Sequence, residues 1–216
     1  MADLPDPILL ILLVALVGVL PFVIFLGTSF VKLVIVLSLI RNALGVQQIP
    51  PNMVLYGLAA VLTFYIMAPV ITAGFEAFSV IDLESAEMPE ILDGLSGAAE
   101  PFRDFLRQHT SETQLAFFMQ TAGQLWPTEM RDAINANNLL ILIPAFTVSQ
   151  LTSAFEIGFM IYLPFIAIDL IVSNILLAMG MMMVSPMTIS LPFKLLLFVM
   201  LDGWTQLIHG LVLSYG

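Results

Sequence analysis

Five ionisable side chains stand in or beside long apolar stretches of this sequence: Lys32, Arg41, Glu156, Asp169 and Lys194. A charged group is costly in lipid, so such residues tend to face partner chains, cavities or transport paths. We interpret all five as subunit-interface residues, and snorkelling to the membrane surface is the alternative that suits Arg41 and Lys194 best. These positions could therefore hold subunits together through ion pairs.

Lys194 needs a partner from outside its own helix. The nearest carboxylate after it is Asp202, eight residues on and therefore ~12 Å away along a helix axis. Glu156 and Asp169 are the carboxylates set in apolar sequence on this side of the chain. We expect one of them to meet Lys194 across a subunit boundary.

Two kinds of proton or covalent chemistry deserve consideration. Glu156 and Asp169 could form the proton relay of an ion-coupled transporter, although no internal repeat of the kind common in transporters is visible. Ser190, His209 and Asp169 could serve an intramembrane hydrolase, but nothing in the sequence brings Ser190 and His209 together. No phosphate-loop, zinc-protease or hydrolase motif occurs, and there are no cysteines. We therefore predict no enzyme activity, cofactor or metal.

A methionine cluster is the most unusual local feature, at Met179-Gly180-Met181-Met182-Met183. Methionine is flexible and polarizable, so it adapts to irregular surroundings. A packed, gap-filling segment is one interpretation. Binding of Cu(I) by the thioethers is chemically allowed, but no His or Cys stands nearby to support it.

The composition places these residues in a membrane setting. The chain of 216 residues is 60% hydrophobic and only 10% charged, against about 25% charged residues in ordinary globular domains. A soluble fold this poor in charge would expose a large apolar surface. The net charge of −10 excludes a broad nucleic-acid surface, which needs clustered Lys and Arg.

Four apolar helical spans, arranged as kinked hairpins, are predicted to position the ionisable groups in an all-α membrane-complex fold. Nineteen uncharged residues suffice to cross a ~30 Å hydrocarbon layer. The spans are Ile8–Leu26, Met53–Ile71, a region within 157–183 that bends at Pro164, and Phe193–Leu213. We expect three parts: N-terminal apolar helices (1–71), an acidic insert (72–138) and a C-terminal apolar hairpin with the methionine-rich loop (139–216).

The insert between spans two and three differs from its flanks. Eleven of the sixteen carboxylates lie between Glu76 and Asp132. Ser111 and Gln114 fit the start of a helix, which Pro127 would end. Lys32 and Arg41 lie between spans one and two, and Lys194 stands at the start of the last span, so the positive-inside rule predicts that both termini and the insert face the outer side of the membrane.

Two ordered blocks resemble the FliP/SctR family of type III secretion export-gate proteins. The first is Val31-Lys32-Leu33-Val34-Ile35-Val36-Leu37-Ser38-Leu39-Ile40-Arg41-Asn42-Ala43-Leu44-Gly45, followed by Gln47-Gln48 and Pro50-Pro51-Asn52. The second includes Pro144-Ala145-Phe146, Ser149-Gln150-Leu151, Ala154-Phe155-Glu156-Ile157-Gly158-Phe159 and Asp202-Gly203-Trp204. Gln150 stands where many relatives carry Glu. The sequence is more similar to the injectisome branch than to the flagellar one.

This resemblance implies a specific function. It implies a virulence-associated, pore-forming export-gate subunit in the bacterial inner membrane, with its insert in the periplasm. About five copies would assemble with SctS-type and SctT-type subunits, contact lipid, and conduct unfolded secreted proteins. The resemblance also implies that Met179, Met181, Met182 and Met183 form a deformable gasket across the pore. In the finished complex, the apolar helices need not all span the bilayer.

Overall fold

The computed structural model describes residues 18, 22, 24–46, 48–79, 94, 96–181 and 183–216. Every regular element among them is helical, which confirms the predicted all-α class. These residues form two compact units, and each is considered by itself. The first unit holds the described residues up to Val31 together with Val70–Val148, and the second holds Lys32–Pro69 together with Ser149–Gly216.

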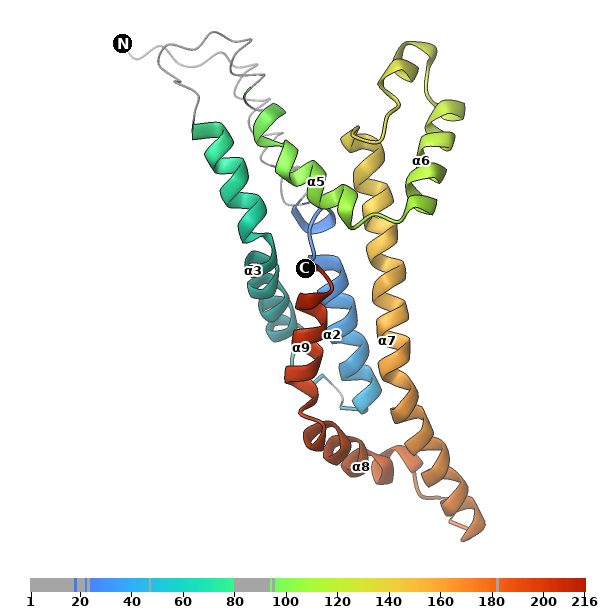
Figure 1. Ribbon diagram of the computed structural model, residues 1–216. Helices are drawn as coiled ribbons and strands as arrows, with labels where there is room; N and C mark the ends of the chain where they lie inside the picture. Colours follow the sequence, from blue (N-terminus) through green and yellow to red (C-terminus); the bar gives the residue numbers. More distant parts are fainter. Residues whose placement is uncertain are drawn as a thin grey trace, which may run out of the picture. The chain divides into compact units, whose positions relative to one another are not determined.

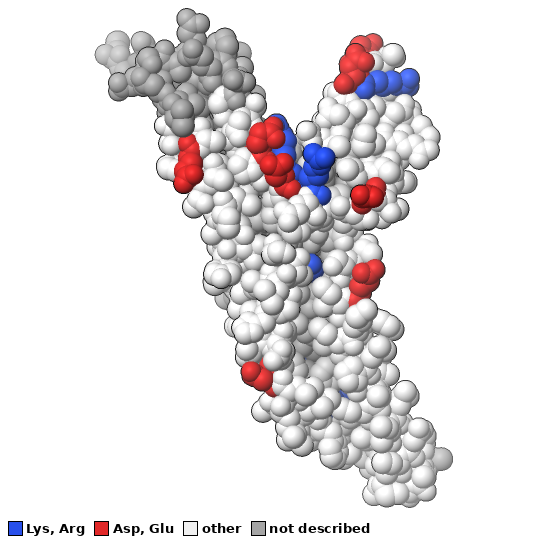
Figure 2. Space-filling view, viewed as in Figure 1, with Lys and Arg blue, Asp and Glu red and all other residues white. Residues whose placement is uncertain are grey.

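The first unit contains the described residues of the acidic insert. Its helices are α5 (Glu100–Gln108), α6 (Glu112–Leu125) and the short 3₁₀ helix η1 (Thr128–Ala133). Phe105 of α5 packs against Phe146, with the ring centroids 5.8 Å apart. Both side chains are buried, so this aromatic contact attaches the amphipathic helix α5 to the beginning of α7 (Leu139–Ala178). Figure 2 shows charged side chains mainly over α5, α6 and η1, and few over α7 to α9.

The predicted start of α6 is correct in position. Ser111 occupies the N-cap in an extended conformation, but its side chain makes no capping hydrogen bond. The helix ends at Leu125, just before Trp126-Pro127. Proline lacks the N–H that would continue the helical hydrogen bonds, which explains the end of the helix.

The second unit is built from α2 (Phe30–Leu44), α3 (Asn52–Ser79) up to Pro69, the later part of α7, α8 (Pro186–Met200) and α9 (Gly203–Leu213). Helix α2 supplies much of its core, including Leu33, Val36, Leu37 and Ile40, which are almost completely buried. Gly158 of α7 lies directly against Leu39 of α2, because a Cβ added at Gly158 would be 2.3 Å from Leu39 Cδ1. The absence of a side chain at Gly158 therefore permits the close approach of α2 and α7.

Among the described residues, two helices are long and apolar enough to cross a membrane, α3 with 28 residues and α7 with 40. A third crossing is possible if α8 and α9 together form one broken span. The described residues thus support two or three spans, and the four predicted spans are not confirmed. The first expected span, Ile8–Leu26, lies largely outside these residues. Helix α3 continues to Ser79, and its residues from Val70 on belong to the first unit.

The last expected span, Phe193–Leu213, is not one straight helix. Helices α8 and α9 meet at a bend of 60° (Figure 1). Asp202 between them has φ +50°, in the left-handed region, which few residues other than Gly, Asn and Asp adopt readily. The Asp202-Gly203 pair is a common turn sequence and explains the break.

Candidate functional site: a network of buried charges

The ammonium group of Lys194 is buried where α8, α7 and the end of α2 meet. Its Nζ donates to Oδ2 of Asp169 on α7 at 2.6 Å and to the carbonyl oxygen of Ala43 at 3.1 Å. Ser190 precedes Lys194 by one helical turn, so both side chains lie on one face of α8. The Ser190 hydroxyl donates to Oδ1 of Asp169 at 2.6 Å. Both oxygens of the carboxylate are therefore bound by α8.

The contact with Ala43 also stabilises the end of α2. The last carbonyl groups of a helix lack partners within the helix, and a cation placed there interacts favourably with the helix dipole. Gly45 follows with φ +74°, a conformation that glycine adopts without strain. Lys194 therefore neutralises Asp169 and caps α2 at the same time.

The sequence predicts that Lys194 meets a carboxylate of a neighbouring copy, and the structure corrects this expectation. Asp169 of the same chain supplies the counter-charge. The spacing along α8 correctly excludes Asp202 as the ion-pair partner of Lys194. It cannot show that α8 packs against α7, which carries Asp169. A contact of Lys194 or Asp169 with a neighbouring copy stays a prediction.

Lys32 is the second buried lysine of this unit, and its surroundings differ. Its Nζ donates to Oγ of Ser214 at 2.9 Å and lies 4.4 Å from the centre of the Tyr215 ring, a cation–π contact. The Tyr215 hydroxyl in turn donates to Oε1 of Gln150 at 2.6 Å. Burial raises the pKa of Tyr215 above its ordinary value, so the phenol keeps the proton that it donates. This network attaches the end of α9 to α2 and α7.

Arg41 and Glu156 are less enclosed. Nη1 of Arg41 donates to the carbonyl oxygen of Pro50 at 3.3 Å and to Oδ1 of Asn52 at 2.5 Å. Glu156 is exposed on α7. Within the part of the chain that the structure describes, the carboxylate of Glu156 has no hydrogen bond or ion pair. Of the five predicted interface residues, Lys194 and Asp169 are thus bonded to each other. Lys32 is buried, and the side chains of Arg41 and Glu156 are accessible.

The methionine cluster forms the turn between α7 and α8. Gly180 has φ +73°, and the amides of Gly180 and Met181 donate to the carbonyls of Leu177 and Leu176. This pattern is a Schellman motif, which ends α7. Met179, Met181 and Met183 are exposed, and Met182 lies outside the described residues. In the single chain, the three described methionine side chains are not buried as gap-fillers.

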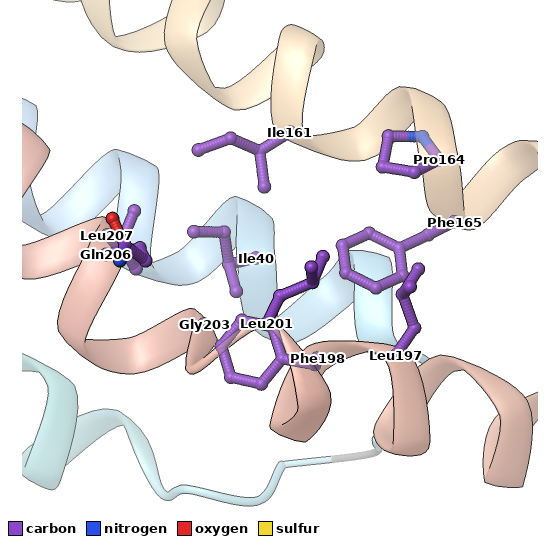
Figure 3. A pocket seen from close by; sticks show the side chains of 10 residues that line it. All are labelled: Ile40, Ile161, Pro164, Phe165, Leu197, Phe198, Leu201, Gly203, Gln206 and Leu207. Carbon is purple, nitrogen blue, oxygen red and sulfur yellow. The ribbon is translucent and has the colours of Figure 1, made fainter.

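An apolar cavity of about 600 Å³ lies beside the bend between α8 and α9. Figure 3 shows side chains from α2, α7, α8 and α9 around it. The amide of Gln206 is the one polar side chain among the lining residues, which are Ile40, Ile161, Pro164, Phe165, Leu197, Phe198, Leu201, Gly203, Gln206 and Leu207. This lining provides no nucleophile or acid–base pair.

The residues considered for a proton relay or a hydrolase do not lie together in the described structure, apart from Ser190 and Asp169. Ser190 is fully buried and donates to Asp169, whereas His209 is exposed on α9. No hydrogen bond joins Ser190 and His209 among the described residues, and none links Glu156 to Asp169. No group of three His, Cys, Asp or Glu side chains suited to a metal occurs in that part of the chain. The hydrogen bonds of Ser190 and Lys194 to Asp169 hold α7 and α8 together.

Sequence reasoning missed the partners that complete both networks. Ser190 was considered only as a nucleophile, although its spacing of four residues from Lys194 is a signal that both bind one group. Ser214, Tyr215 and the Ala43 carbonyl were not considered, and only tertiary structure brings them to the lysines. Gln150, noted as a departure from Glu, accepts a hydrogen bond from a neutral phenol.

Apolar helices joined by buried, hydrogen-bonded charges define an all-helical membrane protein. A sequence profile described as the FliP family matches residues 13–211. The chain therefore belongs to the FliP family, as its motifs predicted.

Close similarity to proteins of secretion systems extends over the full length. Yop proteins translocation protein R of Yersinia pestis is 56% identical over 216 residues, covering 100% of both chains. Virulence protein YscR of Salmonella typhimurium is 51% identical over 214 residues, with 99% of each chain covered. Hypersensitivity response secretion protein HrcR of Ralstonia nicotianae is 46% identical over 211 residues, covering 95% of this chain and 96% of the relative. The expected likeness to the injectisome branch is confirmed.

The two partners of the buried ion pair should differ in their sensitivity to mutation. The side chain of Lys194 is 4% exposed and that of Asp169 is 36% exposed. Asp169→Asn leaves the more buried charge unpaired and should lower the free energy of unfolding by about 3 kcal/mol. Lys194→Met should cost less, because water reaches Asp169, and adding it to Asp169→Asn should recover stability. Chemical unfolding in mild detergent measures these differences. Asp202→Asn, an exposed control, should change stability by at most about 0.5 kcal/mol. An equal loss in Asp169→Asn and Asp202→Asn would contradict this account.

Proposed function

We propose that this chain is a structural subunit of a type III protein-secretion export apparatus in the bacterial inner membrane. The observation that carries the proposal is that the chain is 56% identical, over its full length, to a Yop translocation protein. The buried polar groups support a structural role, because their hydrogen bonds connect helices. The chain's contribution is to form and hold a conduit, without covalent chemistry.

We propose further that several copies, five as the family resemblance implies, form the wall of a pore for unfolded substrate proteins. Helix α7 has 40 residues, about 60 Å at 1.5 Å per residue, twice the ~30 Å hydrocarbon layer. Large apolar side chains are exposed along it, including Phe155, Phe159, Leu170 and Ile175. Lipid alone cannot cover this length in an upright helix, so protein neighbours must cover the rest. SctS-type and SctT-type subunits would complete the assembly.

The acidic segment would face the periplasm. Its carboxylates are poorly suited to lipid, and basic residues Lys32, Arg41 and Lys194 occur in the apolar flanks. Of these, Arg41 lies in the last turn of α2, and the positive-inside rule favours the cytoplasmic side for a basic residue near the end of a helix. Lipid would surround the remaining exposed apolar faces.

The proposal predicts that protein secretion depends on this chain. Deleting its gene should reduce type III substrates in the culture medium to background, while their synthesis inside the cell continues. A plasmid copy should restore export. Quantitative immunoblots of medium and cell fractions make the measurement. Undiminished secretion by the deletion strain would contradict the proposed function.

We propose that Met179, Met181, Met182 and Met183 form a flexible gasket at the narrowest part of the assembled pore. The described members are exposed in the turn between two helices, where unbranched side chains can meet those of neighbouring copies. Methionine suits such a seal because its flexible, polarizable side chain conforms to objects of different shape.

Replacing Met181, Met182 and Met183 together by Ala should leave assembly intact but open a resting leak. Alanine removes flexible bulk and keeps the backbone of the turn. Conductance of the purified complex in planar bilayers measures the leak, and it should rise several-fold. The matched control replaces Met119, Met130 and Met200, which lie elsewhere, and should conduct like the wild type. A correctly assembled triple variant with unchanged conductance would show that the cluster does not seal the pore.

A further inference from the structure

Arg41 and Glu156 are two opposite charges in the apolar flanks that no partner neutralises within the described chain. All six Lys and Arg residues of the sequence are described. Among those in the flanks, Lys194 is paired with Asp169 and Lys32 is buried beneath Tyr215. Arg41 is therefore the one accessible flank cation without a carboxylate in the described structure, and Glu156 is set in exposed apolar surface.

The two groups cannot meet within one chain, because they lie on opposite sides of a packed helix pair. Helices α2 and α7 are in close contact at Leu39 and Gly158. Arg41 follows Leu39 by two residues, and Glu156 precedes Gly158 by two. Two residues correspond to a rotation of about 200° around a helix. Arg41 therefore points away from α7, and Glu156 points away from α2.

The guanidinium of Arg41 is positioned to receive a carboxylate. Its Nη1 is held by Pro50 and Asn52, which fixes the orientation of the planar group. Nε and Nη2 have no hydrogen-bond partner among the described residues. A fixed guanidinium edge binds a carboxylate through two parallel hydrogen bonds.

The surroundings of both charges are also suited to contact with protein. Phe155 and Phe159 are exposed beside Glu156, and Ile49 and Met53 are exposed near Arg41, with Met53 84% exposed. An apolar surface with a single charge at its centre resembles an interface core that contains one specific polar contact. The opposite charges make the two surfaces complementary.

We propose that Glu156 of one copy forms an ion pair with Arg41 of the neighbouring copy. This inference rests on the proposed function, which requires several copies. Because two different surfaces of the chain meet, the contact is head-to-tail, and each added copy again offers a free Glu156 and a free Arg41. Such an interface generates a ring when the rotation closes.

Charge reversal tests the pair in the intact export complex. Arg41→Glu and Glu156→Arg should each reduce the multimeric fraction on native gels about tenfold, since one charge then faces a like charge. The variant that carries both substitutions should recover at least half of the wild-type fraction. As a control, Glu76→Arg reverses another exposed carboxylate, one that lies in the regular helix α3, and should not rescue Arg41→Glu.

Chemical cross-linking provides a test that does not depend on charge. The chain has no cysteine, so copies carrying Arg41→Cys and copies carrying Glu156→Cys, with different tags, can be expressed together. A short bismaleimide is preferable to oxidation, because long paired side chains separate the backbones beyond disulfide geometry. We expect a cross-linked dimer containing both tags, and none when Glu76→Cys, at an exposed position of helix α3, replaces Glu156→Cys.

The outcomes separate this pair from the proposed function. Absence of the dimer, or charge variants that assemble and secrete like the wild type, would overturn the pair and leave the secretion role intact. In either case, another subunit or lipid would cover the surfaces around Arg41 and Glu156. A wild-type chain that stays monomeric in secreting cells would overturn both the pair and the multicopy pore.

Discussion

The buried ammonium group of Lys194 must be paired and hydrogen-bonded, and this requirement determines how α8 packs in the second unit. Lys194 is nearly inaccessible to water, and a buried charge is tolerated only when it is paired and hydrogen-bonded. Asp169 and the Ala43 carbonyl meet this need, so α8 is fixed against α7 and against the end of α2 at one point. The turn that carries the methionine cluster lies between these fixed helices, and its position follows from theirs.

The second buried lysine completes the frame. Lys32 belongs to α2, as does Ala43, and its contacts with Ser214 and Tyr215 hold the end of α9. Helix α2 therefore receives α8 at its C-terminal end and α9 towards its N-terminal end. The bend at Asp202 lies between these two attachments. In an apolar setting, a few directional bonds of this kind select one arrangement among many that bury similar surface.

The sequence predicts the elements better than their contacts, and the reasons are physical. Uncharged runs predict α3, and the change from polar to apolar residues at Asn138-Leu139 predicts the start of α7. The bend at Asp202 was missed, although Asp-Gly is a turn signal, because the surrounding apolar run dominates the pattern. The partner of Lys194 could not be predicted, since helical spacing describes one helix and not its neighbours. The family motifs, by contrast, extend along both flanks and identified the family directly.

We propose that this chain functions as one of several copies in a protein-export gate. Native mass measurement of the complex, extracted in mild detergent from secreting cells, tests it most directly. The account predicts a particle containing several copies of the 23.7 kDa chain, five by the family resemblance, together with two other small membrane subunits. A particle with a single copy of the chain would contradict it.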